Sequence, residues 1–306
     1  MNRPRVFRTL RLPVLVALAA LLASVPLSAA SPIADVHMHW KWSQKEVTTV
    51  EQAVAALRDN DIALAVITGT PPELALELAD AAPEVVVPIV GIYRYTGHWS
   101  RWHRDPKVLE RTRELLETGR FHGIGEVHLI AGFISNWQAP VIDGLFRLAA
   151  EFDVPVLVHT EFSRANYLVE LCAAHPDTRM LWAHAGAILP PAEVKRVIDS
   201  CPNVWVELSA RDPWRFVAKP VSDDAGRLLP QWRELVLAYP DRFMIGSDPV
   251  WPVEQLDGWD QPDTGWQELG RFLGFHRTWI DDLPPEAAER VRLTNAQALF
   301  RTAGGR

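Results

Sequence analysis

The residues best suited to chemistry are histidines and acids near the ends of short apolar runs. The first two, His37 and His39, lie in the segment Asp35-Val36-His37-Met38-His39. Side chains at positions i and i+2 of a β-strand point to the same face, so these two imidazoles can hold one metal ion. Further candidates follow in chain order: Glu126, His159, His184 and Asp248. This pattern predicts a metal site assembled from several strands.

Strand-like runs alternate with amphipathic helical patterns along the sequence. The expected strands are 34–39, 62–69, 85–92, 123–129, 154–160, 179–185, 204–209 and 243–248. Helical patterns lie at 50–60, 73–80, 108–118, 141–152 and 193–200. The strands are rich in Val, Ile and Leu at both odd and even positions, which is typical of strands buried on both faces. The alternation predicts an α/β fold, a (β/α)8 TIM barrel of parallel strands.

An open doubly wound sheet is the alternative fold for such an alternation. That fold usually carries a glycine-rich phosphate-binding turn after its first strand, whereas the first strand here ends in His37-Met38-His39-Trp40. The candidate ligands also stand in the last residues of their strands, and a barrel gathers all carboxyl ends on one rim. The sequence therefore favours the barrel.

Zinc is commonly held by imidazole and carboxylate ligands, with one position left open for water in a catalytic site. We expect His37, His39, His159 and Asp248 to hold such an ion. Zinc can lower the pKa of a bound water to ~7, which supplies hydroxide at neutral pH. Asp248 could then accept the water proton and pass it to a leaving group. His184 would either polarise the substrate carbonyl or bind a second ion.

Residues 1–30 have the pattern of a secretory signal peptide. Four arginines precede an apolar run at 12–22, which is shorter than the ~20 residues that span a bilayer, and Ser28-Ala29-Ala30 is a small-residue cleavage signal. An uncleaved membrane anchor is the alternative. We expect residues 31–306 to form a single catalytic barrel, periplasmic or secreted, with a length that suits the ~250 residues of this fold.

Charge and cysteine content limit the partners. The chain has 31 Lys and Arg against 38 Asp and Glu, a net charge of −7. Without the four arginines of residues 1–30, which contain no acid, the charge is −11. This argues against nucleic acid or an anionic membrane surface as a partner and leaves a small-molecule substrate. Cys172 and Cys201 stand late in neighbouring expected helices, where they either form one disulfide or remain buried thiols.

These motifs resemble the amidohydrolase superfamily, in the amidohydrolase-related branch that contains aminocarboxymuconate semialdehyde decarboxylase and several lactonases. The resemblance covers essentially all of residues 31–306. It rests on the order of seven motifs: Asp35-Val36-His37-Met38-His39, Gly123-Ile124-Gly125-Glu126, Val158-His159-Thr160, Ala183-His184-Ala185-Gly186, Asn203-Val204-Trp205-Val206-Glu207-Leu208-Ser209, Gly246-Ser247-Asp248 and Asn295-Ala296-Gln297-Ala298-Leu299-Phe300. The resemblance implies a distorted (β/α)8 barrel with a divalent metal, zinc or alternatively manganese, on its carboxyl-end rim.

Glu126 bears on the number of metal ions. In relatives with two metals, strand four supplies a bridging ligand, a modified lysine or a glutamate, and the one-metal relatives do without it. Glu126 occupies the corresponding position. Either Glu126 and His184 bind a second ion, or Glu126 orients a histidine and His184 faces the substrate.

Four weaker candidates for substrate binding are Trp40, Arg94, Glu161 and Arg211. Glu161 has the strand parity of His159. The two arginines follow strands three and seven, where each suits either a substrate carboxylate or a surface ion pair. Trp40 is one of several tryptophans after strands, which would either wall an aromatic pocket or pack loops together. His128, which has the parity of Glu126, is expected to be structural.

The residues together predict an exported metal-dependent hydrolase that uses a metal-activated water on an ester, lactone or amide carbonyl. The alternative is a non-oxidative decarboxylase on the same site, because relatives in this branch use the same ligands to hold a carboxylated substrate. A third possibility is a metal- or solute-binding protein without turnover.

Overall fold

The computed structural model describes residues 31–95, 97–130, 134, 137–161, 163–215, 219–250 and 264–300. The chain divides into two compact units, residues 1–30 and 31–306. The expected signal segment lies outside the described residues, and every described strand and helix belongs to the second unit. No helix in the described ranges is both long and apolar enough to cross a membrane.

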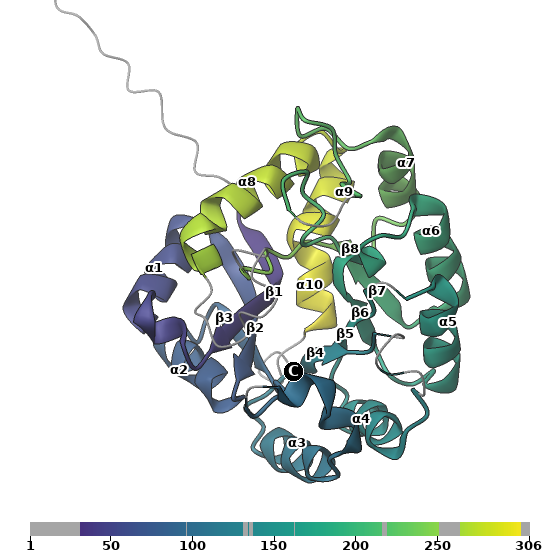
Figure 1. Ribbon diagram of the computed structural model, residues 1–306. Helices are drawn as coiled ribbons and strands as arrows, with labels where there is room; N and C mark the ends of the chain where they lie inside the picture. The colour runs from purple at the N-terminus through teal and green to yellow at the C-terminus, as the bar shows by residue number, and fades with distance from the viewer. Residues whose placement is uncertain are drawn as a thin grey trace, which may run out of the picture. The chain divides into compact units, whose positions relative to one another are not determined.

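Parallel strands form the inner wall of this unit (Figure 1). The first sheet contains β1 (Ile33–Lys41), β2 (Ile62–Thr70) and β3 (Val86–Ile89). The second contains β4 (Ile124–His128), β5 (Val156–His159), β6 (Met180–Trp182), β7 (Val204–Glu207) and β8 (Phe243–Met244). All paired strands are parallel, as buried Val- and Ile-rich runs predict.

Backbone hydrogen bonds join the two sheets at both seams. Between β3 and β4, Val90 N donates to Gly123 O at 2.9 Å. Between the end of β8 and β1, Val36 N donates to Ile245 O at 3.0 Å and Asp248 N donates to His37 O at 2.8 Å. These bonds complete the ring, and the predicted (β/α)8 barrel is confirmed.

Helices surround the strands (Figure 1). They are α1 (Val50–Asp59), α2 (Glu73–Ala81), α3 (Lys107–Glu117), α4 (Pro140–Glu151), α5 (Ala165–Ala174), α6 (Pro191–Ser200), α7 (Pro230–Ala238), α8 (Leu269–Ile280), α9 (Pro285–Glu289) and α10 (Asn295–Leu299). The side chains of Leu299 and Phe300 pack with Val36 and other apolar residues that face the barrel interior. Asn295 donates to the carbonyl of Phe243, the first residue of β8. The C-terminal helix therefore closes the amino end of the barrel and leaves the carboxyl end for the site.

Cys172 and Cys201 form a disulfide. Cys172 lies in α5, and Cys201 directly follows α6. Of the two alternatives that the sequence left open, the structure has the bridge, which ties two neighbouring outer helices together.

Several strands end earlier than expected, and two of them, β6 and β8, end before a candidate ligand. β6 ends at Trp182 and β8 at Met244, although the apolar runs predicted extension to Ala185 and Asp248. The backbone leaves the extended conformation there, because φ is 56° at His184, 49° at Ala185 and 43° at Asp248. The apolar pattern of the sequence does not predict such turns, which carry the candidate ligands His184 and Asp248.

Candidate metal centre

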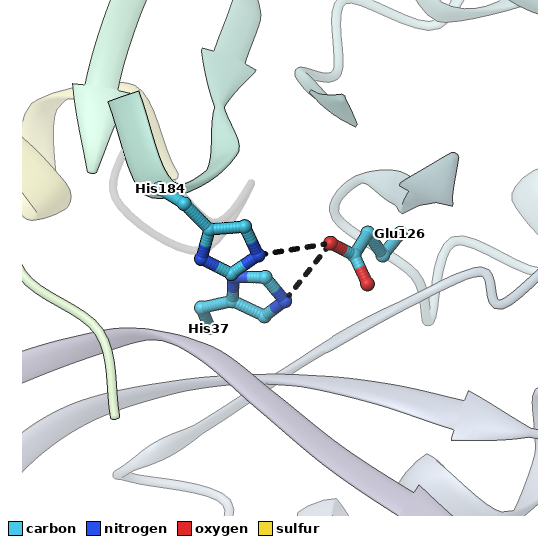
Figure 2. Close-up of side chains that lie close together, drawn as sticks. All are labelled: His37, Glu126 and His184. Carbon is cyan, nitrogen blue, oxygen red and sulfur yellow. Dashed lines mark ion pairs between the residues drawn. The ribbon is translucent and has the colours of Figure 1, made fainter. Parts of the chain in front are cut away.

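The six strongest candidate residues converge at the carboxyl end of the barrel. Figure 2 shows three of them, from β1, from β4 and from the turn after β6. Glu126 Oε1 lies 3.4 Å from His37 Nε2 and 3.7 Å from His184 Nε2. Each of the three side chains is at least 95% buried, so the carboxylate and both imidazoles are withdrawn from bulk water.

A first group of donor atoms comes from β1 and the end of β8. His37 Nε2 and His39 Nε2 are 3.1 Å apart, as the i, i+2 spacing predicts. Asp248 Oδ1 lies 3.4 Å from His39 Nε2 and 3.8 Å from His37 Nε2. Gly246 allows this approach, because a Cβ there would lie 2.7 Å from the Cβ of His37.

A second group, formed by His159, Glu161 and His184, lies next to Glu126. His159 Nδ1 lies 2.6 Å from Glu126 Oε1, and His159 Nε2 lies 3.0 Å from Glu161 Oε2. Donor atoms of His159, Glu161 and His184 all lie within 4.8 Å of one another. The structure thus places His159 beside Glu126 and His184, whereas the sequence pattern grouped it with His37, His39 and Asp248.

Glu126 lies between the two groups. Its carboxylate oxygens are 2.6–3.7 Å from the imidazole nitrogens of five histidines: His37, His39, His128, His159 and His184. Asp248 Oδ1 is buried and has no hydrogen-bond partner among the described residues. Imidazole nitrogens and carboxylate oxygens are the donors that zinc and similar ions take. The donor set therefore fits a divalent metal.

Glu207, at the end of β7, orients two of these histidines, His37 directly and His184 through Ser209. A carboxylate only accepts, so His37 Nδ1 donates to Glu207 Oε1 at 2.9 Å, and Nε2 of His37 is left for an ion. Glu207 Oε1 also accepts from Ser209 Oγ, whose oxygen lies 2.8 Å from His184 Nδ1. Both residues belong to one of the sequence motifs, but no role was predicted for them. The available signal was that Glu207 and Ser209 have the same strand parity at the end of a strand.

His128 is held by Tyr93. The phenolic oxygen accepts from His128 N at 2.9 Å and lies 2.6 Å from His128 Nδ1. Both contacts orient the ring, and Nε2 of His128 lies 3.4 Å from Glu126 Oε2. This arrangement fits the structural role expected for His128.

Burial and charge shift the pKa values of these groups in opposite directions. Burial alone would raise the pKa of Glu207, but His37 and His184 lower it to about 2. Burial would lower the pKa of His159, but Glu126 and Glu161 raise it to about 10. The site thus attracts positive charge, which a divalent ion would supply.

The weaker substrate-binding candidates have different environments. Arg94 is exposed after β3. Glu161, partly exposed beside His159, remains at the site. The expected substrate role of Arg211 is not supported, because its side chain is fully buried and donates to backbone carbonyls. Trp40 is also fully buried and packs edge-on against Trp266, so it belongs to the core rather than to a pocket wall.

Several solved structures share this fold at low sequence identity. An amidohydrolase from Burkholderia multivorans with bound zinc has a TM-score of 0.58 and 16% identity, over 89% of this chain and 100% of that one. A probable 2-pyrone-4,6-dicarboxylic acid hydrolase from Acinetobacter baumannii has a TM-score of 0.54 and 14% identity, over 88% and 99%. A dihydroxybenzoic acid decarboxylase from Polaromonas sp. JS666 with bound manganese has a TM-score of 0.54 and 11% identity, over 88% of this chain and 97% of that one.

No curated protein matches the sequence. The amidohydrolase family model matches residues 103–302, which include β4 to β8 and four of the six candidate ligands. That match spans more than half of the sequence, and the chain belongs to the amidohydrolase family.

Proposed function

We propose that this amidohydrolase is a hydrolase of esters, lactones or amides that works with two divalent ions, zinc or manganese. The observation that carries the proposal is the position of Glu126, whose carboxylate lies between the group of His37, His39 and Asp248 and the group of His159 and His184. A carboxylate with two oxygens in that position suits a bridge between two ions.

His37, His39 and Asp248 would hold one ion, His159 and His184 the other, and Glu126 both. When bound, such ions supply Lewis acidity that lowers the pKa of water and polarises a carbonyl oxygen. Asp248 Oδ1 accepts the proton of the attacking water and returns it to the leaving group. Burial alone would raise the pKa of Asp248, but His37, His39 and His184 lower it, so the carboxylate is ionised at neutral pH.

Decarboxylation of an aromatic acid remains the alternative, because the decarboxylase from Polaromonas shares the fold. One observation favours hydrolysis. Of the two arginines expected to bind a substrate carboxylate, Arg211 is buried and engaged with the backbone. Arg94, after β3, is the other of the two and is exposed.

Export is part of the proposal and rests on the residue pattern of positions 1–30. The mature enzyme would then meet its small-molecule substrate outside the cytoplasm. The disulfide between Cys172 and Cys201 is consistent with an oxidising compartment.

A panel of substrates tests the proposed reaction. The purified protein, loaded with zinc or manganese, is assayed against lactones, esters, amides and aromatic carboxylic acids, and its metal content is measured. Turnover of a lactone, ester or amide that chelators abolish supports the proposal. Release of CO2 from an aromatic acid without hydrolysis would replace it with the decarboxylase, and bound metal without any turnover would favour a binding protein.

A further inference from the structure

The backbone that carries His184 and Asp248 is in an unfavourable conformation. At His184, Ala185 and Asp248, φ is 56°, 49° and 43°. The left-handed region is unfavourable for a residue with a Cβ, and it persists where surrounding contacts fix it. Both candidate ligands therefore need external support.

Arg211 provides that support at the end of β6. Its Nε donates to His184 O at 2.9 Å. Its Nη1 and Nη2 atoms donate, at 2.7–3.2 Å, to the carbonyls of Ala185, Leu189 and Lys219. The side chain is fully buried. Its donors are thus directed at the polypeptide around His184.

Arg215 provides the same support at the end of β8. Its Nη1 donates to Asp248 O at 2.8 Å, and its Nη2 donates to Ser247 O at 2.5 Å. Asp212 Oδ2 pairs with Nε of Arg215 at 2.8 Å, and both side chains are almost fully buried. The guanidinium also lies 3.8 Å from the ring centroid of Phe272. A charge pair with this packing fixes the direction of the two terminal N–H groups.

We propose that Arg211 and Arg215 are positioning residues that hold His184 and Asp248 in the geometry of the metal centre. They stand four residues apart in the segment Arg211-Asp212-Pro213-Trp214-Arg215, which follows β7 between the ends of β6 and β8. Each supports a different donor group, Arg211 the one with His184 and Arg215 the one with Asp248. The expected change in metal affinity rests on the proposed function.

Conservative substitutions separate positioning from general stability. Lysine keeps the charge of arginine but cannot donate several N–H bonds from a planar fork, so Arg211→Lys and Arg215→Lys should both disturb the supported carbonyls. Arg242→Lys is the matched control. Arg242 also donates to backbone carbonyls, Val204 O at 2.9 Å and Cys201 O at 2.7 Å, but at the amino end of β7.

Zinc affinity, measured by competition with a chelator, is the first readout. Arg211→Lys and Arg215→Lys should each weaken zinc binding by ~10-fold or more, because support behind metal ligands is typically worth 10–100-fold. Arg242→Lys should lower the free energy of unfolding of the metal-free protein and leave zinc affinity unchanged. If Arg211 acts through His184, Arg211→Lys should add little to the loss caused by His184→Ala. Unchanged zinc affinity in both test variants would overturn the proposal.

Crystal structures of the metal-free variants are the second readout and do not depend on metal binding. Arg211→Lys should shift φ of His184, and Arg215→Lys should shift φ of Asp248, out of the left-handed region. If the wild type bound no divalent ion, the proposed function would fail, and this comparison would still decide the role of the arginines. Left-handed φ angles at both His184 and Asp248 in the two variants would contradict the positioning role of the arginines.

Discussion

Glu207 Oε1 and His37 Nδ1 are 2.9 Å apart at the base of the site, and both side chains are completely buried. The carboxylate holds the Nδ1 proton of His37 and directs Nε2 toward Glu126 and Asp248. Because the same oxygen accepts from His184 N at 2.8 Å, one buried acid orients a histidine of each donor group. Glu207 therefore orients residues of both donor groups through hydrogen bonds to His37 and His184.

Glu207→Gln should weaken zinc binding by ~10–100-fold. A neutral amide is a poorer acceptor for His37 Nδ1–H and no longer stabilises the imidazole dipole beside an ion. Chelator competition measures the change, with Glu151→Gln on the exposed surface of α4 as the control. Wild-type affinity in a folded Glu207→Gln protein would show that the bond to His37 is dispensable.

Asp248→Asn should lower kcat by ~10²-fold or more, because the amide cannot accept the proton of the attacking water. The fold should be retained, since the backbone bonds from Arg215 to Asp248 O and Ser247 O do not involve the side chain. Steady-state kinetics and metal analysis on the same sample provide the test. Undiminished kcat in a metal-loaded variant would remove Asp248 from proton transfer.

His276→Gln should make the protein less sensitive to acid. Burial lowers the pKa of His276 to about 3 in the folded state, where the ring lies beside Gly246 O, against 6.5 for the ordinary value. The unfolded chain thus binds one more proton between these values, and stability falls as pH drops from 6.5 towards 3. The slope approaches ~1.4 kcal/mol per pH unit. Urea unfolding of both proteins at several pH values measures it, and equal slopes would contradict the assignment.

We expect the protein to be exported, to begin at Ser31 and to contain no free thiol. Mass spectrometry of the native protein, with and without reduction before thiol labelling, checks both statements. An intact Met1 in a membrane fraction would point to an anchor instead of a cleaved signal. Free Cys172 and Cys201 in freshly isolated protein would exclude the disulfide.

The barrel could be predicted from sequence because its signals are local. Buried runs such as β2 and β5 need apolar residues on both faces, and amphipathic helices must cover them. The i, i+2 spacing of His37 and His39 likewise follows from strand geometry alone. Such features are encoded over a few neighbouring residues.

The environments of single polar residues could not be predicted in the same way. Arg211 follows a strand, where a substrate contact and a structural contact have the same sequence pattern, and only the folded backbone shows that its donors meet the carbonyls of residues 184, 185, 189 and 219. The strand position of Glu207 was a signal, but its partner could not be predicted, because His37 lies 170 residues away. The packing of Trp40 against Trp266 is equally long-range.

The metal content of the protein tests the central claim most directly. Metal-free protein titrated with zinc or manganese should bind two ions per chain, and Glu126→Gln should bind one, because a neutral amide bridges two cations poorly. His184→Ala should also lose one ion, while a wild-type enzyme with both ions hydrolyses its substrate. Saturation of the wild type at one ion, with that ion retained in both variants, would contradict a two-metal site bridged by Glu126.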